Sequence, residues 1–444
     1  MTTNISYIIK GGTPLKGSLR VGGAKNASYK LMIAALLGEN PSTILNFSHI
    51  SDVQLVAEIT SYLGASAKTY GERAYIIDPR GLAKSEIPQR FGEASRASSM
   101  FLGPLLARFG EAKVPLPGGD KIGARPLERH IHGLEALGAK VLHKNDVLIA
   151  TAEELHGAEY TFSKNTHTGT ETMILAAVKA KGTTILRNAA AETEVDDLIS
   201  FLNAMGADIK RTADREITIN GVQHLSGAIH KIMPDQNQVV SFACAALASK
   251  GDIIIEDTNA NDLASFIEAL DQAGARYEIG SYGMRFFYEK TLKATNITTD
   301  IHPGFKTDWQ PLWVTLMTQA KGESILHETV SQSRFGYLSS LEKMGASFEL
   351  FNPKVENPDS FYNFNLDDVT ENDFHAAKIS GPKSLVASEV TVKDLRHGAT
   401  MLIAGIIAQG TSVIHDPENH IDRGYEAIEK TLTSLGADIQ RITK

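Results

Sequence analysis

Residues 182–207 read GTTILRNAAAETEVDDLISFLNAMGA and contain two markers of a unit that recurs along the chain. The first marker is a glycine that opens a short β-rich run, and the second is a Leu/Met/Ala-Gly-Ala tripeptide that ends an amphipathic helix. The run begins at Gly38, Gly110, Gly182, Gly251, Gly322 and Gly410, and the tripeptide is centred on Gly64, Gly138, Gly206, Gly274, Gly345 and Gly436. Because the two markers stay in step, we infer six copies of one unit of about 70 residues.

Each copy has the same predicted order of elements. Stretches rich in alanine and leucine, such as residues 26–38 and 170–182, predict a buried helix whose closing glycine adopts a left-handed backbone. A short strand, a loop, an amphipathic helix and two further strands follow. The segment around residues 351–374 is extra and rich in Asn, Asp and Pro, so we expect a surface insertion there.

Modules of this size favour two lobes of three units over the alternative, a solenoid of six stacked units. The N-terminal strands around residues 6–21 have no helix before them, so we expect them to complete the last copy. The predicted fold is α/β (α+β), with residues 1–22 and 234–444 in a C-terminal lobe and residues 23–233 in an N-terminal lobe. The glycines of segment 117–126 predict a mobile loop in the N-terminal lobe.

The composition excludes several classes of protein. The 444 residues carry a net charge of −8, which gives no general attraction to nucleic acid. The single cysteine, Cys244, allows neither an intrachain disulfide nor a cysteine-based zinc site and fits a reducing compartment. The first residues lack the apolar core of a signal peptide, and no apolar run is long enough to span a membrane. We expect a cytoplasmic enzyme without a nucleic-acid or membrane partner; its oligomeric state stays open.

Polar and charged residues gather at two positions of the repeat. At the starts of the buried helices lie Lys25, Asn26, Arg96, Thr168–Glu171, Asp235, Asp308, Asp394 and Arg396. In the loops after the short strands lie Asp120, Arg125, Glu194, Arg334 and Arg423. Helix N-termini favour anions, and arginine binds phosphate and carboxylate groups in bidentate fashion. Cations at equivalent positions of an acidic chain therefore predict a cleft for a ligand with several negative charges.

Three further signals are weak. A Walker-like glycine spacing at residues 118–123 is followed by Ala-Arg instead of Lys-Ser/Thr, which argues against a P-loop. Cys244 lies in an apolar helix and is interpreted as an inert core residue. A polar loop is a better interpretation than a metal site for His415, Asp416, Glu418 and His420.

Four motifs suggest a family: GGAKNA at 22–27, PGG at 117–119, IGARP at 122–126 and HIDRGYE at 420–426. With these motifs the whole chain resembles the enolpyruvyl transferases, in particular the members that act on UDP-N-acetylglucosamine. The related shikimate-pathway synthase shares the fold but not this set of motifs. The resemblance implies an inside-out α/β barrel of two lobes, each made of three β-α repeats, that close over a deep cleft.

The resemblance also implies an activity, the first committed step of peptidoglycan precursor synthesis. The enolpyruvyl group of phosphoenolpyruvate is transferred to the 3-hydroxyl of UDP-N-acetylglucosamine, and phosphate is released. The reaction passes through a tetrahedral phospholactoyl ketal and needs neither metal nor cofactor. It needs a base for the sugar hydroxyl, an acid for C3 of the enolpyruvyl group, and cations for phosphate and carboxylate.

The resemblance assigns roles to individual residues. The residues implied to hold phosphoenolpyruvate are Lys25, Arg125 and Arg423, with Arg96, Arg334 and Arg396 completing the cationic lining. Asn26 and Asp308 would contact the sugar, with Asp308 as the base. Asp394 would assist proton transfer and help to position Lys25 or Arg423. The residues implied near the nucleotide are Glu128, His130, Thr166 and Thr168, and Glu194 is expected near the mouth of the cleft.

One departure from the family concerns the proton donor. Most members carry cysteine after PGG, and this chain carries Asp120. A carboxyl group can serve as the acid where burial or a neighbouring negative charge raises its pKa, and some members carry aspartate here. Because the epoxide fosfomycin alkylates the usual thiol, the sequence predicts an active enzyme that resists fosfomycin.

Two ligand-facing or hinge segments also depart from the family. The usual Ser-Val-Gly is Thr-His-Thr at residues 166–168, and the usual Arg-x-Glu is Gln-Asn-Gln at residues 236–238. A divergent enzyme with the ordinary acceptor explains both changes. The alternatives are a paralogue that acts on another nucleotide or phosphorylated alcohol, and a catalytically silent binding protein that keeps the cleft.

Overall fold

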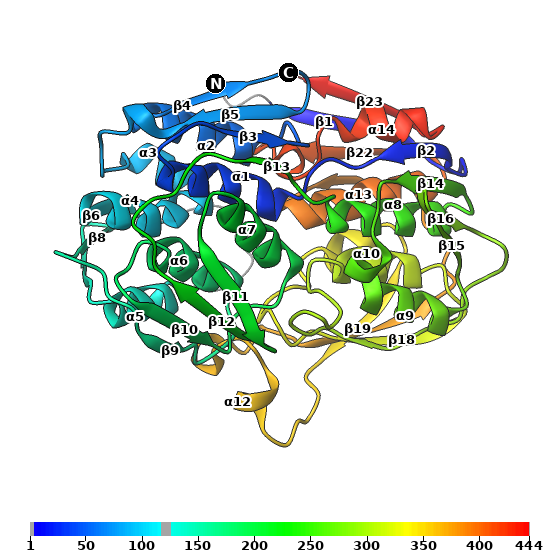
Figure 1. Cartoon of the computed structure of the whole chain (residues 1–444). Helices are drawn as coiled ribbons and strands as arrows, with labels where there is room; N and C mark the ends of the chain where they lie inside the picture. Colours follow the sequence, from blue (N-terminus) through cyan, green and yellow to red (C-terminus); the bar gives the residue numbers. More distant parts are fainter. Residues whose placement is uncertain (1–3, 117–125, 444) are drawn as a thin grey trace. The chain divides into compact units, whose positions relative to one another are not determined.

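The structure is a computed structural model that describes residues 4–116 and 126–443. Over these residues the chain forms two compact units. Colours in Figure 1 follow the sequence from blue at the N-terminus to red at the C-terminus. The C-terminal unit contains residues 4–21 and 234–443, and the N-terminal unit contains residues 22–116 and 126–233.

The N-terminal unit contains the first three repeats. The first repeat comprises α1 (Lys25–Ala34), the 3₁₀ turn η1 (Ala35–Leu37), β3 (Ser42–Leu45), α2 (Ser51–Tyr62), β4 (Ser66–Thr69) and β5 (Ala74–Asp78). The second comprises η2 (Pro79–Gly81), α3 (Gln89–Ala94), η3 (Arg96–Phe101), α4 (Leu102–Phe109), β6 (Glu111–Pro115), α5 (Glu128–Ala136), β7 (Lys140–Lys144) and β8 (Val147–Thr151). The third comprises β9 (Glu159–Thr161), α6 (His167–Ala177), β10 (Thr183–Arg187), α7 (Thr193–Ala204), β11 (Asp208–Ala213) and β12 (Glu216–Asn220), and β13 (Ile229–Lys231) follows it.

The C-terminal unit begins with β1 (Ile5–Lys10) and β2 (Lys16–Arg20). The fourth repeat comprises α8 (Gln236–Ala248), β14 (Asp252–Glu256), η4 (Ala260–Leu263), α9 (Ala264–Ala273), β15 (Arg276–Gly280) and β16 (Gly283–Phe287). The fifth comprises β17 (Ile297–Thr298), α10 (Gln310–Met317), β18 (Gly322–His327), α11 (Leu338–Lys343), β19 (Ser347–Phe351), α12 (Pro358–Phe361), η5 (Leu366–Asp368) and β20 (Ala376–Gly381). The sixth comprises β21 (Glu389–Thr391), α13 (Leu395–Ile407), β22 (Thr411–Asp416), η6 (Ile421–Arg423), α14 (Ile428–Ser434) and β23 (Asp438–Thr443).

Each repeat builds a sheet of its own, as the six copies predict. The strand orders are β13-β3-β5-β4, β6-β8-β7, β9-β10-β12-β11, β2-β14-β16-β15, β17-β18-β20-β19 and β21-β22-β1-β23. In the four-stranded sheets the first strand of each order runs parallel to its neighbour, and the remaining pairs are antiparallel. The α/β class predicted from the repeats is confirmed.

The two N-terminal strands separate, which corrects the expectation that both complete the last repeat. β1 pairs antiparallel with both β22 and β23, so it fills the third place in the sixth sheet. β2 instead pairs parallel with β14 and joins the fourth sheet. The sixth repeat lacks a final strand after β23 within residues 4–443, and β1 supplies it from the start of the chain.

Each repeat contains one apolar helix that is buried over most of its length: α1, α4, α6, α8, α10 or α13. All thirteen residues of α8 are buried, and within the C-terminal unit α8, α10 and α13 pack on one another. A helix that is apolar all round is stable only inside a core, so the sheets must lie outside these helices. The polar residues at the helix N-termini are therefore carried into the interior of the unit.

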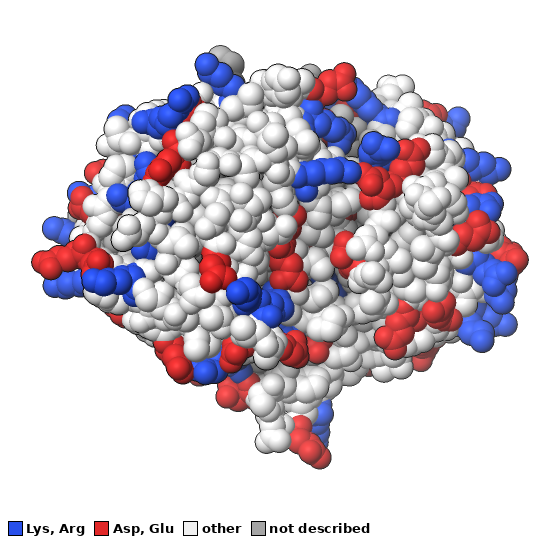
Figure 2. All heavy atoms as spheres, in the orientation of Figure 1, with Lys and Arg blue, Asp and Glu red and all other residues white. Residues whose placement is uncertain are grey.

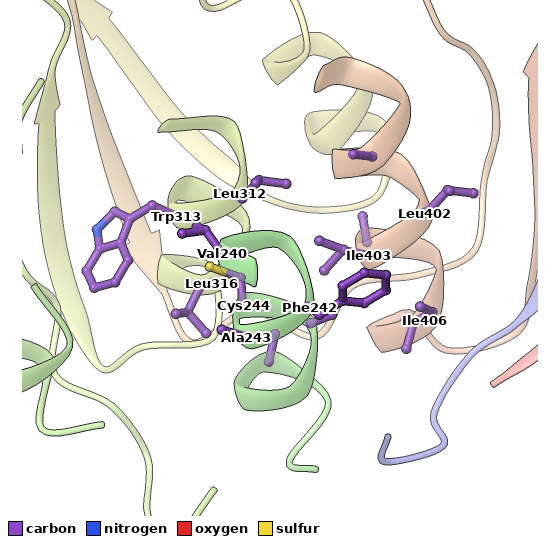
Figure 3. Packing of buried hydrophobic residues seen from close by; sticks show 14 of the residues in the cluster. Val240, Phe242, Ala243, Cys244, Leu312, Trp313, Leu316, Leu402, Ile403 and Ile406 are labelled. Carbon is purple, nitrogen blue, oxygen red and sulfur yellow. The ribbon is translucent and has the colours of Figure 1, made fainter. Parts of the chain in front are cut away.

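The core of the C-terminal unit also explains the lone cysteine. Figure 3 shows Cys244 on α8 among Leu312, Trp313 and Leu316 of α10, while Phe242 faces α13. Burial raises the pKa of the Cys244 thiol far above its ordinary value, so it stays protonated. The interpretation of this residue as inert core is confirmed.

Glycine conformations agree with most of the predicted helix ends. All six tripeptide glycines have positive φ, between 70° and 106°. The closing glycines Gly110, Gly182 and Gly410 are also left-handed, but Gly38 is not, with φ −73°. There the prediction is wrong, because α1 continues as the 3₁₀ turn η1 and leaves Gly38 extended.

The extra residues of the fifth repeat lie between β19 and β20 and contain α12. In Figure 1 this segment projects from the rest of the C-terminal unit, as expected for a surface insertion. Within the described part of the chain, no helix is both long and apolar enough to cross a membrane.

Candidate functional site

The polar centre of the C-terminal unit is Asp308, whose carboxylate lies between two arginines. Arg334 Nη2 donates to Asp308 Oδ1 at 2.5 Å, and Arg396 Nη2 donates to Asp308 Oδ2 at 3.0 Å. Both arginines are about 94% buried, whereas the side chain of Asp308 is 28% exposed. The carboxylate therefore pairs with two buried cations and keeps contact with solvent.

The three residues of this cluster come from three chain segments. Two of these segments are the starts of buried helices, and the third is a loop. Asp308 lies just before α10, Arg396 is the second residue of α13, and Arg334 follows β18. Asp394 caps α13, because its Oδ1 accepts the backbone N–H groups of Arg396 and His397, both at 2.9 Å. This cap fixes the first turn of the helix that carries Arg396.

Arg396 has a second set of partners on the sixth repeat. Its Nη1 donates to the hydroxyl of Tyr425 at 3.0 Å, and that hydroxyl lies 2.6 Å from Ser241 Oγ. Burial lowers the pKa of Arg396, but Asp308 and Tyr425 outweigh it, and the net shift is upward. Arg396 is thus a fixed cation rather than a titrating group.

The start of α8 is one of the segments that depart from the family. Its side chains form hydrogen bonds with residues that precede and follow Asp308 in the sequence. Lys306 Nζ donates to Gln236 Oε1 at 2.6 Å, and Trp309 Nε1 donates to Asn237 Oδ1 at 2.9 Å. Gln238 Nε2 donates to the carbonyl of Gly424 at 3.1 Å. These amides hold neighbouring segments together within the unit.

In the N-terminal unit, Lys25 lies at the first position of α1. Its Nζ is 2.8 Å from Asp52 Oδ2, and both side chains are largely buried. Asp52 lies in the first turn of α2, where the helix dipole favours a carboxylate. The ion pair therefore fixes a cation beside the half-buried Asn26, which the sequence placed at the same site.

The start of α6 carries the other altered segment and a buried charge network. Thr166 caps the helix by accepting the N–H of Gly169 at 3.2 Å, and Thr168 Oγ1 lies 3.0 Å from Nε2 of the buried His130. Lys30 on α1 pairs with Glu171 on α6 at 2.5 Å, and both are almost completely buried.

His167 joins the network of Lys30 and Glu171. His167 Nε2 lies 3.1 Å from Glu171 Oε1 and 3.2 Å from Lys30 Nζ. Burial lowers the pKa of His167, but the charge of Glu171 and a hydrogen bond to it outweigh burial, so the pKa is raised overall. Protonated His167 donates to Glu171, whereas neutral His167 can accept from Lys30 through the same nitrogen.

This raised pKa predicts a pH dependence of stability. Because the folded protein binds the His167 proton more tightly than the unfolded chain, the stabilisation is complete below the ordinary imidazole pKa of about 6.5. It is lost as pH rises through the raised pKa of the folded state. We expect His167→Gln to flatten the decline in unfolding free energy above about pH 6.5, measured by denaturant titration at several pH values. His143→Gln, on the exposed face of β7, is the control and should reproduce the parent curve.

The remaining predicted residues lie on other elements of the repeats. Arg96 is the first residue of η3, Glu128 is exposed at the start of α5, and Glu194 is buried in the first turn of α7. Arg423 is the last residue of η6. The predictions for Asp120 and Arg125, and for the loop at 117–126 except its last residue, lie outside the described residues.

Sequence reasoning missed the buried carboxylate Glu328 in the C-terminal unit. It assigned Asp416 to a polar loop, whereas the structure places this residue at the buried end of β22. Glu328 and Asp416 are both 0% exposed and accept backbone N–H groups. Each is the seventh residue of a strand run, GESILHE from Gly322 and GTSVIHD from Gly410, and an acidic residue at this shared position was the available signal. The sequence also missed Asp52, the partner of Lys25.

Over residues 4–116 and 126–443, no group of three or more His, Cys, Asp or Glu side chains could hold a metal ion. Figure 2 shows acidic and basic side chains interspersed on the face that it presents, without one dominant sign. The concentration of charge at Asp308, Arg334 and Arg396 is local and sets two guanidinium cations against one carboxylate.

The comparisons with known proteins cover the whole chain. The family model described as EPSP synthase (3-phosphoshikimate 1-carboxyvinyltransferase) matches residues 9–432. The chain belongs to this family of enolpyruvyl transferases. A protein of Desulforapulum autotrophicum named UDP-N-acetylglucosamine 1-carboxyvinyltransferase is 38% identical over 98% of this chain and 99% of its own length. A relative from Caldanaerobacter subterraneus, named UDP-N-acetylglucosamine 1-carboxyvinyltransferase 3, is 39% identical with the same coverage.

Solved structures support the enolpyruvyl transferase fold. The enolpyruvyl transferase NikO from Streptomyces tendae superposes with a TM-score of 0.84 at 22% identity, over 100% of both chains. EPSP synthase from Acinetobacter baumannii superposes with a TM-score of 0.75 at 19% identity, over 99% of this chain and 100% of that one. At these identities the likeness concerns the fold alone, and it agrees with the fold implied by the sequence motifs.

Proposed function

We propose that this chain transfers the enolpyruvyl group of phosphoenolpyruvate to the 3-hydroxyl of UDP-N-acetylglucosamine and releases phosphate. The observation that carries the proposal is the full-length match, at 38–39% identity, to relatives named for that reaction. The carboxylate of Asp308, flanked by two buried arginines, suits a reaction of anionic substrates that also needs a base.

The proposed reaction assigns each bond change. Asp308 accepts the proton of the sugar 3-hydroxyl, whose oxygen bonds to C2 of phosphoenolpyruvate while Asp120 protonates C3. The resulting phospholactoyl ketal then loses a C3 proton and its C2–O bond to phosphate, which restores the double bond. Lys25, Arg125 and Arg423 hold the phosphoenolpyruvate, and the other proposed substrate-binding residues are Asn26, Arg96, Glu128, His130, Thr166, Thr168, Glu194, Arg334 and Arg396.

The ion pairs of Asp308 add a requirement to this mechanism. A carboxylate that accepts from two guanidinium groups is stabilised as an anion and is a weak base. An anionic substrate that takes over Arg334 or Arg396 would free one oxygen of Asp308 for the sugar hydroxyl. We therefore propose that binding of phosphoenolpyruvate activates the base.

The test is phosphate release from phosphoenolpyruvate, measured with and without UDP-N-acetylglucosamine. Turnover that requires this acceptor supports the proposal, together with a role in cell-wall precursor synthesis. Turnover with another nucleotide or phosphorylated alcohol, and none with UDP-N-acetylglucosamine, would identify a paralogue. Binding without turnover of any acceptor would identify a silent protein.

The altered start of α6 is the observation that favours the paralogue as second candidate. His167 places an ionisable ring there, tied to Lys30 and Glu171. If the segment selects another acceptor, then His167→Val should shift the ratio of kcat/KM values between UDP-N-acetylglucosamine and other UDP-sugars. An unchanged ratio favours the ordinary acceptor.

Asp120 leads to a prediction about inhibition. A carboxylate is a poorer nucleophile toward an epoxide than a thiolate, so we expect fosfomycin to cause no time-dependent inactivation of the parent protein. Asp120→Cys should retain activity and become inactivated, with fosfomycin adding its mass to the protein. Mass spectrometry of both proteins after incubation checks this. A covalent adduct on Asp120 would refute the predicted resistance, and an active but insensitive Asp120→Cys variant would show that the loop has been misaligned.

A further inference from the structure

Two repeats end their short strand with a buried carboxylate. Counting from the opening glycine, the seventh residue is Glu328 in the fifth repeat and Asp416 in the sixth. At the same position the third and fourth repeats carry Asn188 and Asp257, which turn the chain with left-handed φ values of 51° and 57°. Glu328 and Asp416 do not have positive φ, so in these two repeats a side chain organises the turn.

Glu328 accepts four hydrogen bonds. Its Oε1 accepts from the N–H of Val330 at 2.9 Å, the N–H of Ser331 at 3.0 Å and the hydroxyl of Thr299 at 2.9 Å. Its Oε2 accepts from the hydroxyl of Thr307 at 2.9 Å. One carboxylate thus bonds both the loop that follows β18 and the segment that precedes α10.

Those two segments carry the main ion pair of the C-terminal unit. Thr307 is the neighbour of Asp308, and Val330 and Ser331 open the loop that reaches Arg334. Arg334 and Asp308 meet at 2.5 Å. Glu328 therefore connects the backbone segment before α10 with the loop after β18. The relative position of these two segments sets the distance between Arg334 and Asp308.

Asp416 accepts backbone N–H groups of the loop that follows β22 in the sixth repeat. Its Oδ1 accepts the N–H of His420 at 2.7 Å, and its Oδ2 accepts the N–H of Ile421 at 2.9 Å. Ile421 is the first residue of η6, His420 precedes it, and Arg423 is the last residue of η6. The two loops use different lengths of chain, but in each a buried carboxylate gathers backbone N–H groups before an arginine.

We propose that Glu328 and Asp416 are positioning residues that set Arg334 and Arg423 for binding phosphoenolpyruvate; the inference rests on the proposed function. A buried carboxylate is costly unless hydrogen bonds compensate it, so these groups fix the loop backbone while the loop satisfies them. Burial raises the pKa of both carboxyls, and the backbone N–H groups oppose that shift. Neither carboxylate needs to touch substrate.

The test compares Glu328→Ala with two matched variants. Glu328→Gln keeps a carbonyl acceptor of the same reach, and Asp257→Gly removes the carboxylate from the same position of the fourth repeat, where glycine suits the left-handed backbone. For each protein, kcat and KM for phosphoenolpyruvate and for UDP-N-acetylglucosamine are measured at a temperature where thermal unfolding shows it folded.

We expect kcat/KM for phosphoenolpyruvate to fall about 10²-fold in Glu328→Ala, since a displacement of about 1 Å can cost that much. The KM for UDP-N-acetylglucosamine should change less than that for phosphoenolpyruvate, since only Asp308 among the displaced residues is assigned to the sugar. Glu328→Gln should recover most of the loss, and Asp257→Gly should match the parent. A merely structural role would lower the folded fraction and kcat without changing KM for phosphoenolpyruvate, and that result would overturn the proposal.

A second variant tests the proposal if Glu328→Ala does not fold. Thr307→Val removes one hydroxyl from the network, and Thr307→Ser keeps it; we expect a smaller loss of the same kind in the first and none in the second. Equal kinetics of Thr307→Val and the parent would overturn the link to Asp308.

A crystal structure of the variant separates this inference from the proposed function. In Glu328→Ala, or in Thr307→Val if the former does not fold, Arg334 Nη2 and Asp308 Oδ1 should separate beyond the 2.5 Å of the parent. An unchanged pair would overturn the positioning role even if the parent is active. Absence of turnover in the parent would overturn the proposed function, while the displaced arginine would still support the positioning role.

Discussion

Replacing Asp308 by asparagine is expected to lower kcat for enolpyruvyl transfer by about 10²–10⁴-fold, the usual contribution of a positioned base. The amide is nearly isosteric but cannot accept the hydroxyl proton. It also leaves Arg334 and Arg396, both about 94% buried, without their shared anion. Steady-state phosphate release with saturating substrates measures the change.

The two consequences of this substitution can be separated. Loss of the anion between buried cations costs stability, by about 3–5 kcal/mol where one partner of a buried pair is removed; the partial exposure of Asp308 reduces that figure. Asp308→Glu keeps the charge and shifts the oxygens, so it should retain more stability and more activity than Asp308→Asn. A folded Asp308→Asn variant with kcat within tenfold of the parent would exclude Asp308 as the base.

The fold could be predicted further from the sequence than the site. Two glycine markers at fixed positions reveal the six repeats, because a glycine at a left-handed turn is a local requirement that the sequence records directly. The separation of β1 from β2 was missed, because parallel pairing of β2 with β14 joins residues more than 230 positions apart and leaves no local pattern. The error concerns β2 alone, because β1 joins the sixth sheet as expected.

For the site, the sequence identified charged residues but not their pairing. Arg334 and Arg396 were expected to line a ligand cleft, and the structure pairs both with Asp308. Ion pairing depends on which helix starts and loops meet after packing, and the three segments come from two different repeats. The sequence places Glu171 at a helix start without a partner. In the structure its carboxylate pairs with Lys30, a buried lysine in a stretch whose composition predicts a core helix.

Lys25→Ala is expected to lower kcat/KM for phosphoenolpyruvate by about 10³-fold, the upper range for loss of one fixed electrostatic donor. Lys25 is the first residue of α1, and Asp52 holds its ammonium group at 2.8 Å, so the cation is positioned before substrate binds.

Because Lys25→Ala also leaves Asp52 without this partner, Asp52→Asn is the necessary comparison. This variant keeps the lysine cation and removes the carboxylate that positions it. We expect Asp52→Asn to raise KM for phosphoenolpyruvate moderately and Lys25→Arg to retain binding with lower kcat, since a planar guanidinium cannot reproduce the compact ammonium. Near-normal kinetics of a folded Lys25→Ala protein would remove Lys25 from the proposed site, whatever the outcome at Asp308.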